Sequence, residues 1–307
     1  MTDPAEDRER ELAELLEEVR RIEVQAKRLV IDILAGGYVS VFRGAGIEFS
    51  EVREYVEGDD PRSVDWNVTA RVGRPYVKKY VDERELTLLF LLDLSPSMSG
   101  AFSPWSSRQA AARIAACLAL SAVRNDDKVG LIAFDDEVRR FVRPEKGASH
   151  ALRIIRDCLA LEGRGRGSRF APALQLLSRA MRRRSIVFLI SDFLAEGWEE
   201  SLRLAARRHD LVAVRILPPE LAPPEGGFLR LEDPETGRVT AVDWSGEKVR
   251  EAYRRRVETW KAETAEMLRR AGVDRMDVPI PADRESDAFV RPILDFFRMR
   301  EERGEKR

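Results

Sequence analysis

The sequence offers few side chains suited to catalysis or to cross-linking. It contains two cysteines and two histidines among 307 residues. Cys117 and Cys158 fall in predicted helices, so we expect reduced core residues and not a disulfide framework. His150 and His209 stand in no recognisable catalytic setting, and a Gly-x-Ser-x-Gly elbow is lacking, which argues against a serine hydrolase. Because a Gly-x-x-x-x-Gly-Lys-Ser/Thr loop is also lacking, we do not expect the protein to hydrolyse ATP itself.

Three further absences bear on location and on partners. No apolar run approaches the roughly 20 residues that a membrane-spanning helix needs. The acidic, polar start of the chain is unlike a secretory signal peptide. A formal net charge of -1 gives no reason to expect a nucleic acid or another polyanion as the main partner. We therefore expect a cytoplasmic protein with no membrane span.

Short apolar runs that alternate with helical patterns make up most of the chain after residue 85. One run, Leu86 to Leu92, ends in Asp93-Leu94-Ser95-Pro96-Ser97, and another, Ile186 to Ile190, ends in Ser191-Asp192. This alternation predicts a doubly wound, mostly parallel sheet with helices on both faces. Ligands of such sheets bind outside the carboxyl ends of the strands. Carboxylates and hydroxyls at that edge favour a hard cation such as Mg²⁺ and indicate metal-assisted binding, not turnover.

The chain divides into four predicted segments. Residues 1–35 predict an amphipathic helix, and residues 36–84 a β-rich block with strands at 38–42 and 75–81. The α/β domain is expected to span residues 85–300, with a hairpin insertion over 228–244, followed by a disordered tail at 301–307. In the block we expect Asp59, Asp60 and Asp65 to pair with nearby arginines.

The order of motifs along the chain resembles that of the von Willebrand factor A domain. A strand is followed by Asp-x-Ser-x-Ser and a helix, then by a glycine-rich loop with a hydroxyl residue, and then by a second strand that ends in Ser-Asp. In that family the combination forms a metal-ion-dependent adhesion site. The resemblance implies that Ser95, Ser97 and Ser168 coordinate Mg²⁺ (or Mn²⁺) directly, with Asp93 and Asp192 acting directly or through water. A coordination position left open would accept a carboxylate from a partner protein. The alternative is that these residues only cap helices and turn loops.

A second resemblance concerns the block before the α/β domain. Its charged and aromatic residues are similar to the signature of the domain-of-unknown-function 58 (DUF58) family, whose members carry such a block before an A-like domain. The matching residues are Gly46-Ile47-Glu48-Phe49, Arg53-Glu54-Tyr55, Gly58-Asp59-Asp60, Arg62, Asp65-Trp66 and Ala70-Arg71. Because genes of that family often accompany those of MoxR-type AAA+ ATPases, the resemblance implies a role as an adaptor or co-chaperone of such an ATPase.

Other functions fit the residues less well. A haloacid dehalogenase-like phosphatase also places an Asp at a strand end beside Mg²⁺, but its general acid would stand where this chain has Ser95. The arginines of residues 163–169 suggest phosphate binding, yet the tract is short, and a flexible loop that delivers Ser168 to the metal is favoured. A metal-independent scaffold, acting through the N-terminal helix or the β-rich block, remains as the second binding hypothesis.

Overall fold

The computed structural model describes residues 17, 20, 48–56, 59–60, 64–81, 86–100, 105–281 and 290–305. Two compact units are distinguished, one of residues 42–85 and one that contains residues 86–307. Glu17 and Arg20 are helical. The rest of the helix predicted over residues 1–35, and the strand predicted at 38–42, lie outside the described residues.

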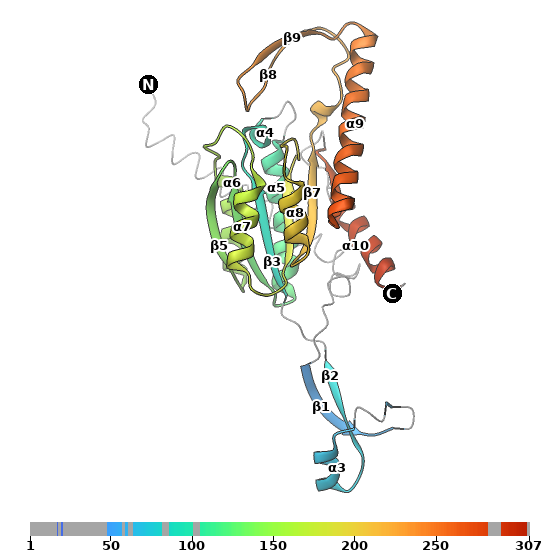
Figure 1. Ribbon diagram of the computed structural model, residues 1–307. Helices are drawn as coiled ribbons and strands as arrows, with labels where there is room; N and C mark the ends of the chain where they lie inside the picture. Colours follow the sequence, from blue (N-terminus) through green and yellow to red (C-terminus); the bar gives the residue numbers. More distant parts are fainter. Residues whose placement is uncertain are drawn as a thin grey trace, which may run out of the picture. The chain divides into compact units, whose positions relative to one another are not determined.

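A six-stranded sheet forms the centre of the larger unit, in the order β10-β7-β6-β3-β4-β5 (Figure 1). All neighbouring strands run parallel except β5, which is antiparallel to β4. The strands are β3 (Thr87–Asp93), β4 (Lys128–Phe134), β5 (Val138–Glu145), β6 (Ile186–Ser191), β7 (Asp210–Leu217) and β10 (Asp274–Pro279). Every residue of β6 and all but the first of β3 are buried, because helices cover both faces of a parallel sheet and leave no face for polar side chains.

Helices lie on both faces of the sheet, as the alternating pattern predicts. They are α5 (Ser107–Arg124), α6 (Ala148–Ala160), α7 (Phe170–Ala180), α8 (Glu199–Ala206), α9 (Glu247–Ala271) and α10 (Val290–Glu305), with the single turn α4 (Pro96–Ser99) after β3. The side chain of Ser106 accepts a hydrogen bond from the Gln109 N–H and forms a capping box at the start of α5. Phe134, Phe170 and Trp198 belong to one buried cluster that joins the sheet to α7 and α8.

The strand order reverses direction between β3 and β6. From β3 the chain builds one half of the sheet through β4 and β5, and from β6 it builds the other half through β7 and β10. The loops that follow β3 and β6 therefore leave the sheet on opposite sides. The carboxyl ends of these two strands mark the position at which doubly wound folds have their ligand-binding crevice. Both loops begin with the polar residues that the sequence places at these two strand ends.

The smaller unit pairs β1 (Glu48–Glu54) with β2 (Tyr76–Val81) in antiparallel fashion. The ion pair expected for Asp59 is confirmed, since both guanidinium nitrogens of Arg53 contact its carboxylate at 2.6 and 2.8 Å. Asp65, expected to join another ion pair, caps helix α3 (Trp66–Val72) by accepting the Asn67 and Val68 N–H groups. The sequence analysis missed both β1 and α3, because dense charge masked their short patterns.

The hairpin predicted over residues 228–244 is confirmed as β8 (Phe228–Glu232) and β9 (Val239–Asp243), which pair antiparallel. The disordered tail predicted from residue 301 is wrong for residues 301–305, because α10 continues to Glu305. Arg300 and Arg303 on this helix form ion pairs with Asp274 on β10, and Arg300 also pairs with Asp210 on β7. No helix within the described part of the chain has the length and apolarity to cross a membrane.

We expect Arg300→Met to lower the free energy of unfolding by about 1–3 kcal/mol, because it leaves the carboxylates of Asp210 and Asp274 partly buried without their shared cation. Urea denaturation measures the change. Arg298→Met, at an exposed position of the same helix, serves as the control and is expected to stay within about 0.5 kcal/mol of the wild type. Equal losses for the two variants would contradict this account of how α10 is held.

Candidate metal centre

Asp93, the last residue of β3, is the centre of a hydrogen-bonded cluster at the crevice. It is fully buried. Its Oδ1 accepts the Ser95 N–H at 2.8 Å, and its Oδ2 accepts the hydroxyls of Ser168 at 2.8 Å and Ser191 at 2.6 Å. Three segments that are far apart in the sequence thus meet on one carboxylate.

Ser95 and Ser97 lie in the turn between β3 and α4. Pro96 occupies the first position of α4 and suits it, because its fixed φ is close to the helical value. The two hydroxyl oxygens are 3.0 Å apart, and Ser95 is fully buried. The spacing of two residues therefore places both hydroxyls on the same side of the turn, next to Asp93.

Asp192 follows β6 and faces the same crevice. It is buried, and its Oδ1 accepts the Leu194 N–H at 3.0 Å. Phe193 adopts a left-handed φ of 59°, which costs energy for a residue with a side chain, and its ring packs edge-on against Phe170 and Trp198. We infer that this aromatic contact holds the turn that directs Asp192 to the site.

The two aspartates carry an electrostatic cost in the metal-free protein. Burial first, and then the charge of Asp192, raise the pKa of Asp93 to about 6. Burial also raises the pKa of Asp192, while hydrogen bonds from the Leu194 N–H and the Ser97 hydroxyl lower it. Neither aspartate forms an ion pair with a described lysine or arginine. A dication next to both would replace repulsion by attraction, so the electrostatics fit a bound metal ion.

The donor set also fits a hard ion. It consists of two carboxylates and the hydroxyls of Ser95, Ser97 and Ser168, which is the all-oxygen chemistry that Mg²⁺ prefers. No group of three or more His, Cys, Asp or Glu side chains able to hold a metal ion is present among the described residues. An ion here would therefore depend on the hydroxyls and on water for most of its shell, as Mg²⁺ commonly does.

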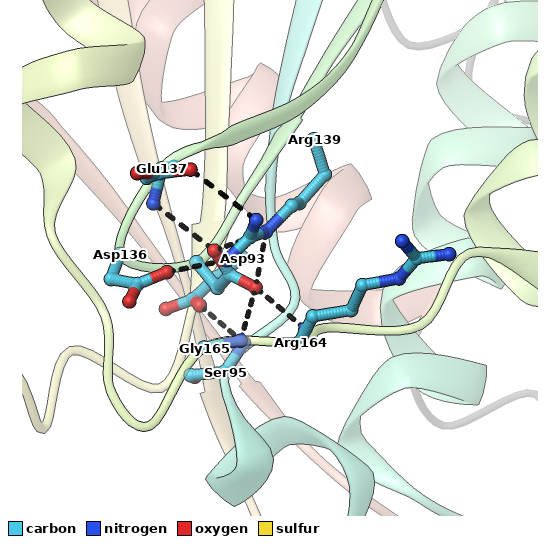
Figure 2. A network of polar contacts seen from close by, with 8 residues as sticks. Asp93, Ser95, Asp136, Glu137, Arg139, Arg164 and Gly165 are labelled. Atoms are coloured by element: carbon cyan, nitrogen blue, oxygen red, sulfur yellow. Dashed lines mark hydrogen bonds and ion pairs between the residues drawn. The ribbon is translucent and has the colours of Figure 1, made fainter.

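The glycine loop (residues 163–167) is fixed by Asp135, a residue that the sequence analysis did not single out. Asp135 is fully buried, and its Oδ2 accepts the N–H groups of Arg164 and Gly165, each at 2.8 Å. Nε of Arg139 donates to both of its carboxylate oxygens, and three of its partners, Arg139, Arg164 and Gly165, are labelled in Figure 2. Burial opposes the charge of Asp135, but the guanidinium of Arg139 and the backbone donors outweigh it and lower its pKa. Hydrogen bonds thus hold the backbone of this loop at Arg164 and Gly165.

Two positions of this loop lie very close to their neighbours, Gly163 to a backbone atom and Gly165 to the end of a side chain that can move aside. A Cβ atom at Gly163 would lie 1.9 Å from the carbonyl oxygen of Leu94, and one at Gly165 would lie 2.2 Å from Oδ1 of Asp136. The loop thus packs directly on the turn after β3, and this contact brings Ser168 to Asp93.

Two further polar residues at the site were missed. Ser191 hydrogen-bonds Asp93 and accepts the Phe193 N–H, although the sequence analysis treated it only as part of a strand end. Glu235, in the turn of the β8–β9 hairpin, accepts a hydrogen bond from the Ser97 hydroxyl at 3.4 Å. Glu235 is 138 residues from Ser97 along the chain, and no sequence pattern near Glu235 indicates that the two side chains meet.

The fold and the site define a doubly wound α/β protein with hydroxyls and carboxylates gathered at its switch point, an arrangement that resembles the von Willebrand factor A domain. The chain belongs to the family described as "Protein of unknown function DUF58", whose model matches residues 51–263.

The chain is similar to mycobacterial proteins described as uncharacterized. An uncharacterized protein of Mycobacterium tuberculosis is 28% identical over 271 residues, which cover 86% of this chain and 84% of that protein. Among solved structures, the conserved hypothetical protein BatB from Bacteroides thetaiotaomicron covers 72% of this chain and 100% of its own, at 17% identity and a TM-score of 0.44. The von Willebrand factor A domain of SpRpn10 covers 69% of this chain and 95% of its own, at 11% identity and a TM-score of 0.37.

Proposed function

We propose that this protein is a non-enzymatic, metal-dependent interaction module. Asp93, Ser95, Ser97, Ser168 and Asp192 would hold Mg²⁺ (or Mn²⁺) at the crevice, and an aspartate or glutamate of a partner protein would complete the shell. When bound, the ion acts as a Lewis acid toward one more anionic oxygen. Through the family resemblance we propose a cytoplasmic adaptor or co-chaperone whose partner is a MoxR-type AAA+ ATPase or its client.

The observation that carries this proposal is the convergence on Asp93. A hydroxyl from the end of β6, a hydroxyl from the residue after the glycine loop and the backbone after β3 all bond to a fully buried carboxylate next to a second buried aspartate. Residues that only cap helices would not need three distant segments to meet at one charge. Such burial is expensive unless the charge is compensated, which a cation would do.

The same geometry disfavours a phosphatase. A nucleophilic aspartate must present a free oxygen to its substrate. Both oxygens of Asp93 accept hydrogen bonds, and the side chain has no exposure to solvent. The position of a general acid two residues further on is held by Ser95, which is also fully buried.

A second candidate is a metal-independent scaffold that binds through the smaller unit. The observation in its favour is the exposure of large apolar side chains there, with Trp66 72% exposed and Val56 61% exposed. Exposed apolar groups of this size mark interaction surfaces when they gather on one face.

Affinity capture distinguishes the two candidates. We expect the tagged full chain to recover a partner from lysate of its source cells in Mg²⁺ and to lose it in EDTA. Asp192→Asn should lose the partner in Mg²⁺ as well, because one carboxylate of the site is gone, whereas Trp66→Ser should retain it. Mass spectrometry of the bound fraction names the partner. Recovery that is equal in Mg²⁺ and in EDTA, but abolished by Trp66→Ser, would support the scaffold and exclude the metal bridge.

A further inference from the structure

The turn of the β8–β9 hairpin, residues 233–238, is organised by Asp233. Its Oδ1 accepts the Glu235 N–H at 2.9 Å, and its Oδ2 accepts the Thr236 hydroxyl at 2.7 Å. Gly237 adopts a φ of 69°, a left-handed conformation that glycine reaches without strain, and its N–H donates to the Asp233 carbonyl at 2.8 Å. The backbone that carries Glu235 is therefore fixed within its own turn.

Glu235 leaves this turn toward the metal centre. Its Oε1 lies 3.4 Å from the Ser97 hydroxyl, and its Oε2 lies 3.6 Å from where a Cβ atom at Gly167 would stand. The carboxylate is thus placed between two of the three segments that form the centre, the turn after β3 and the loop that ends at Ser168. Among residues 232–241, Glu235 is the one that is not exposed.

The strands of the hairpin make little contact with the rest of the domain. Phe228 on β8 is 70% exposed, and Val239 on β9 is 46% exposed. The base of the hairpin is anchored by Trp244. This residue is buried, its backbone N–H donates to the Gly227 carbonyl, and its ring packs edge-on against Tyr253 of α9. Figure 1 shows β8 and β9 extending from the side of α9 toward α4, the turn that carries Ser97. The hairpin is therefore fixed at its base and reaches the site through its turn.

In the metal-free protein this contact places negative charge next to negative charge. The negative charges of Asp192 and Asp233 are close enough to repel the carboxylate of Glu235. No described arginine or lysine pairs with Glu235 to offset the repulsion. The position of the Glu235 carboxylate is electrostatically unfavourable without a cation and becomes favourable when a cation binds next to it.

We propose that Glu235 is an internal ligand of the metal centre: its carboxylate, carried by the hairpin, takes the place that an acidic residue of a partner would otherwise take. This inference rests on the proposed function, because it needs an ion at Asp93 and Asp192. Mg²⁺ then draws the hairpin turn to the site, and by linkage the closed turn raises the affinity for Mg²⁺. A partner carboxylate must displace Glu235, so the hairpin regulates access to the ion.

The test compares Glu235→Gln with Glu232→Gln in the full-length protein. Both variants remove one negative charge and keep the side-chain size, and Glu232 is an exposed residue of the same hairpin. Two quantities are measured with Mg²⁺ as the only added ligand: its affinity, by titration calorimetry, and the hydrogen exchange of the amides in residues 233–238. We expect Mg²⁺ to slow this exchange in the wild type and in Glu232→Gln but not in Glu235→Gln. We also expect the affinity for Mg²⁺ to fall about 10-fold in Glu235→Gln alone.

The outcomes separate this inference from the proposed function. If the wild type binds Mg²⁺, and Glu235→Gln matches it in both affinity and turn protection, Glu235 is not a ligand while the metal centre stands. If the wild type binds no Mg²⁺, the metal centre and the internal ligand are both wrong. If Glu232→Gln lost as much affinity for Mg²⁺ as Glu235→Gln, the loss would be explained by the change in net charge. That result would also overturn the inference.

Discussion

Replacing Asp93 by asparagine (D93N) will abolish Mg²⁺ binding and will at the same time stabilise the metal-free protein. The loss of affinity should exceed about 100-fold, since the site loses the carboxylate on which its hydroxyls converge and outer-shell changes alone cost 10–100-fold. The gain in stability has a different origin. Asp93 is a fully buried charge that Asp192 repels, and an amide of the same size is neutral. The hydroxyls of Ser168 and Ser191 can rotate to accept from the amide, so the fold is kept.

The stability gain depends on pH in a direction that the pKa of Asp93 fixes. This pKa is about 6 in the folded protein, above the ordinary value of 3.8 for an aspartate. The folded state holds the proton more tightly, so the wild type becomes more stable as the pH falls through 6 and loses that stability as the pH rises. Asparagine does not titrate. We therefore expect D93N to exceed the wild type by about 1–3 kcal/mol at pH 7.5 in EDTA, and by less at pH 4.5, where the carboxyl is protonated in the folded protein but still mostly ionised in the unfolded chain.

Urea denaturation at the two pH values and calorimetric titration with Mg²⁺ measure both effects. Asp295→Asn, which removes a carboxylate that is 60% exposed on α10, is the control and should change neither quantity appreciably. A D93N variant that binds Mg²⁺ nearly as well as the wild type would contradict the proposed metal centre. A D93N variant that is less stable than the wild type at pH 7.5 in EDTA would show that the Asp93 carboxylate stabilises the fold without a metal.

The sequence predicts the central sheet and the strand ends well because both depend on local patterns. A strand such as that formed by Ile186 to Ile190 is covered on both faces of the sheet, so all of its residues are apolar. The apolar run ends where the chain leaves the sheet. The order of such runs and of the helical patterns between them is enough to suggest a doubly wound sheet. Asp93 and Asp192 could be placed at one edge on this basis alone, because parallel strands end at the same edge.

The residues that the sequence analysis missed depend on contacts between distant segments. Asp135 was visible only as part of a turn between two strands, and its partners Arg164 and Gly165 follow about 30 residues later. The hairpin around Glu235 was predicted from its turn residues, but the place that its turn reaches is set by the path from β7 to α9. Local patterns determine elements, whereas tertiary packing determines which turn meets which site.

The ends of the α/β domain show the same limit. The charged C-terminal stretch has the composition of a disordered tail. It nevertheless forms the end of α10, because arginines of this helix form ion pairs with aspartates on β7 and β10. Arg300 reaches Asp210 on β7, a residue 90 positions away, and this contact holds the last turns of α10 against the sheet. The helix α3 was missed for a related reason, since its cap Asp65 resembled one more member of a charge cluster.

Gly163→Ala is the change outside the metal ligands that we expect to damage the site most. The added methyl group would lie 1.9 Å from the Leu94 carbonyl oxygen, a backbone atom that follows β3 and cannot swing aside. Gly163 has no positive φ, so backbone strain contributes nothing and the effect is one of space alone. The loop must lift from the turn after β3, which breaks its bonds to Asp135 and withdraws Ser168 from Asp93. We expect the free energy of unfolding to fall by about 2–4 kcal/mol.

Gly167→Ala is the matched control for Gly163→Ala. It adds the same methyl group to the same loop, also at a position without a positive φ, but the nearest atom is Oε2 of Glu235 at 3.6 Å, an ordinary contact. Its stability should stay within about 0.5 kcal/mol of the wild type. Calorimetric titration with Mg²⁺ should show a loss of at least about 10-fold for Gly163→Ala, because the hydroxyl of Ser168 no longer reaches the ion. Equal stability of the two variants would mean that the loop has room to shift, and that close packing on the turn after β3 is not what places Ser168.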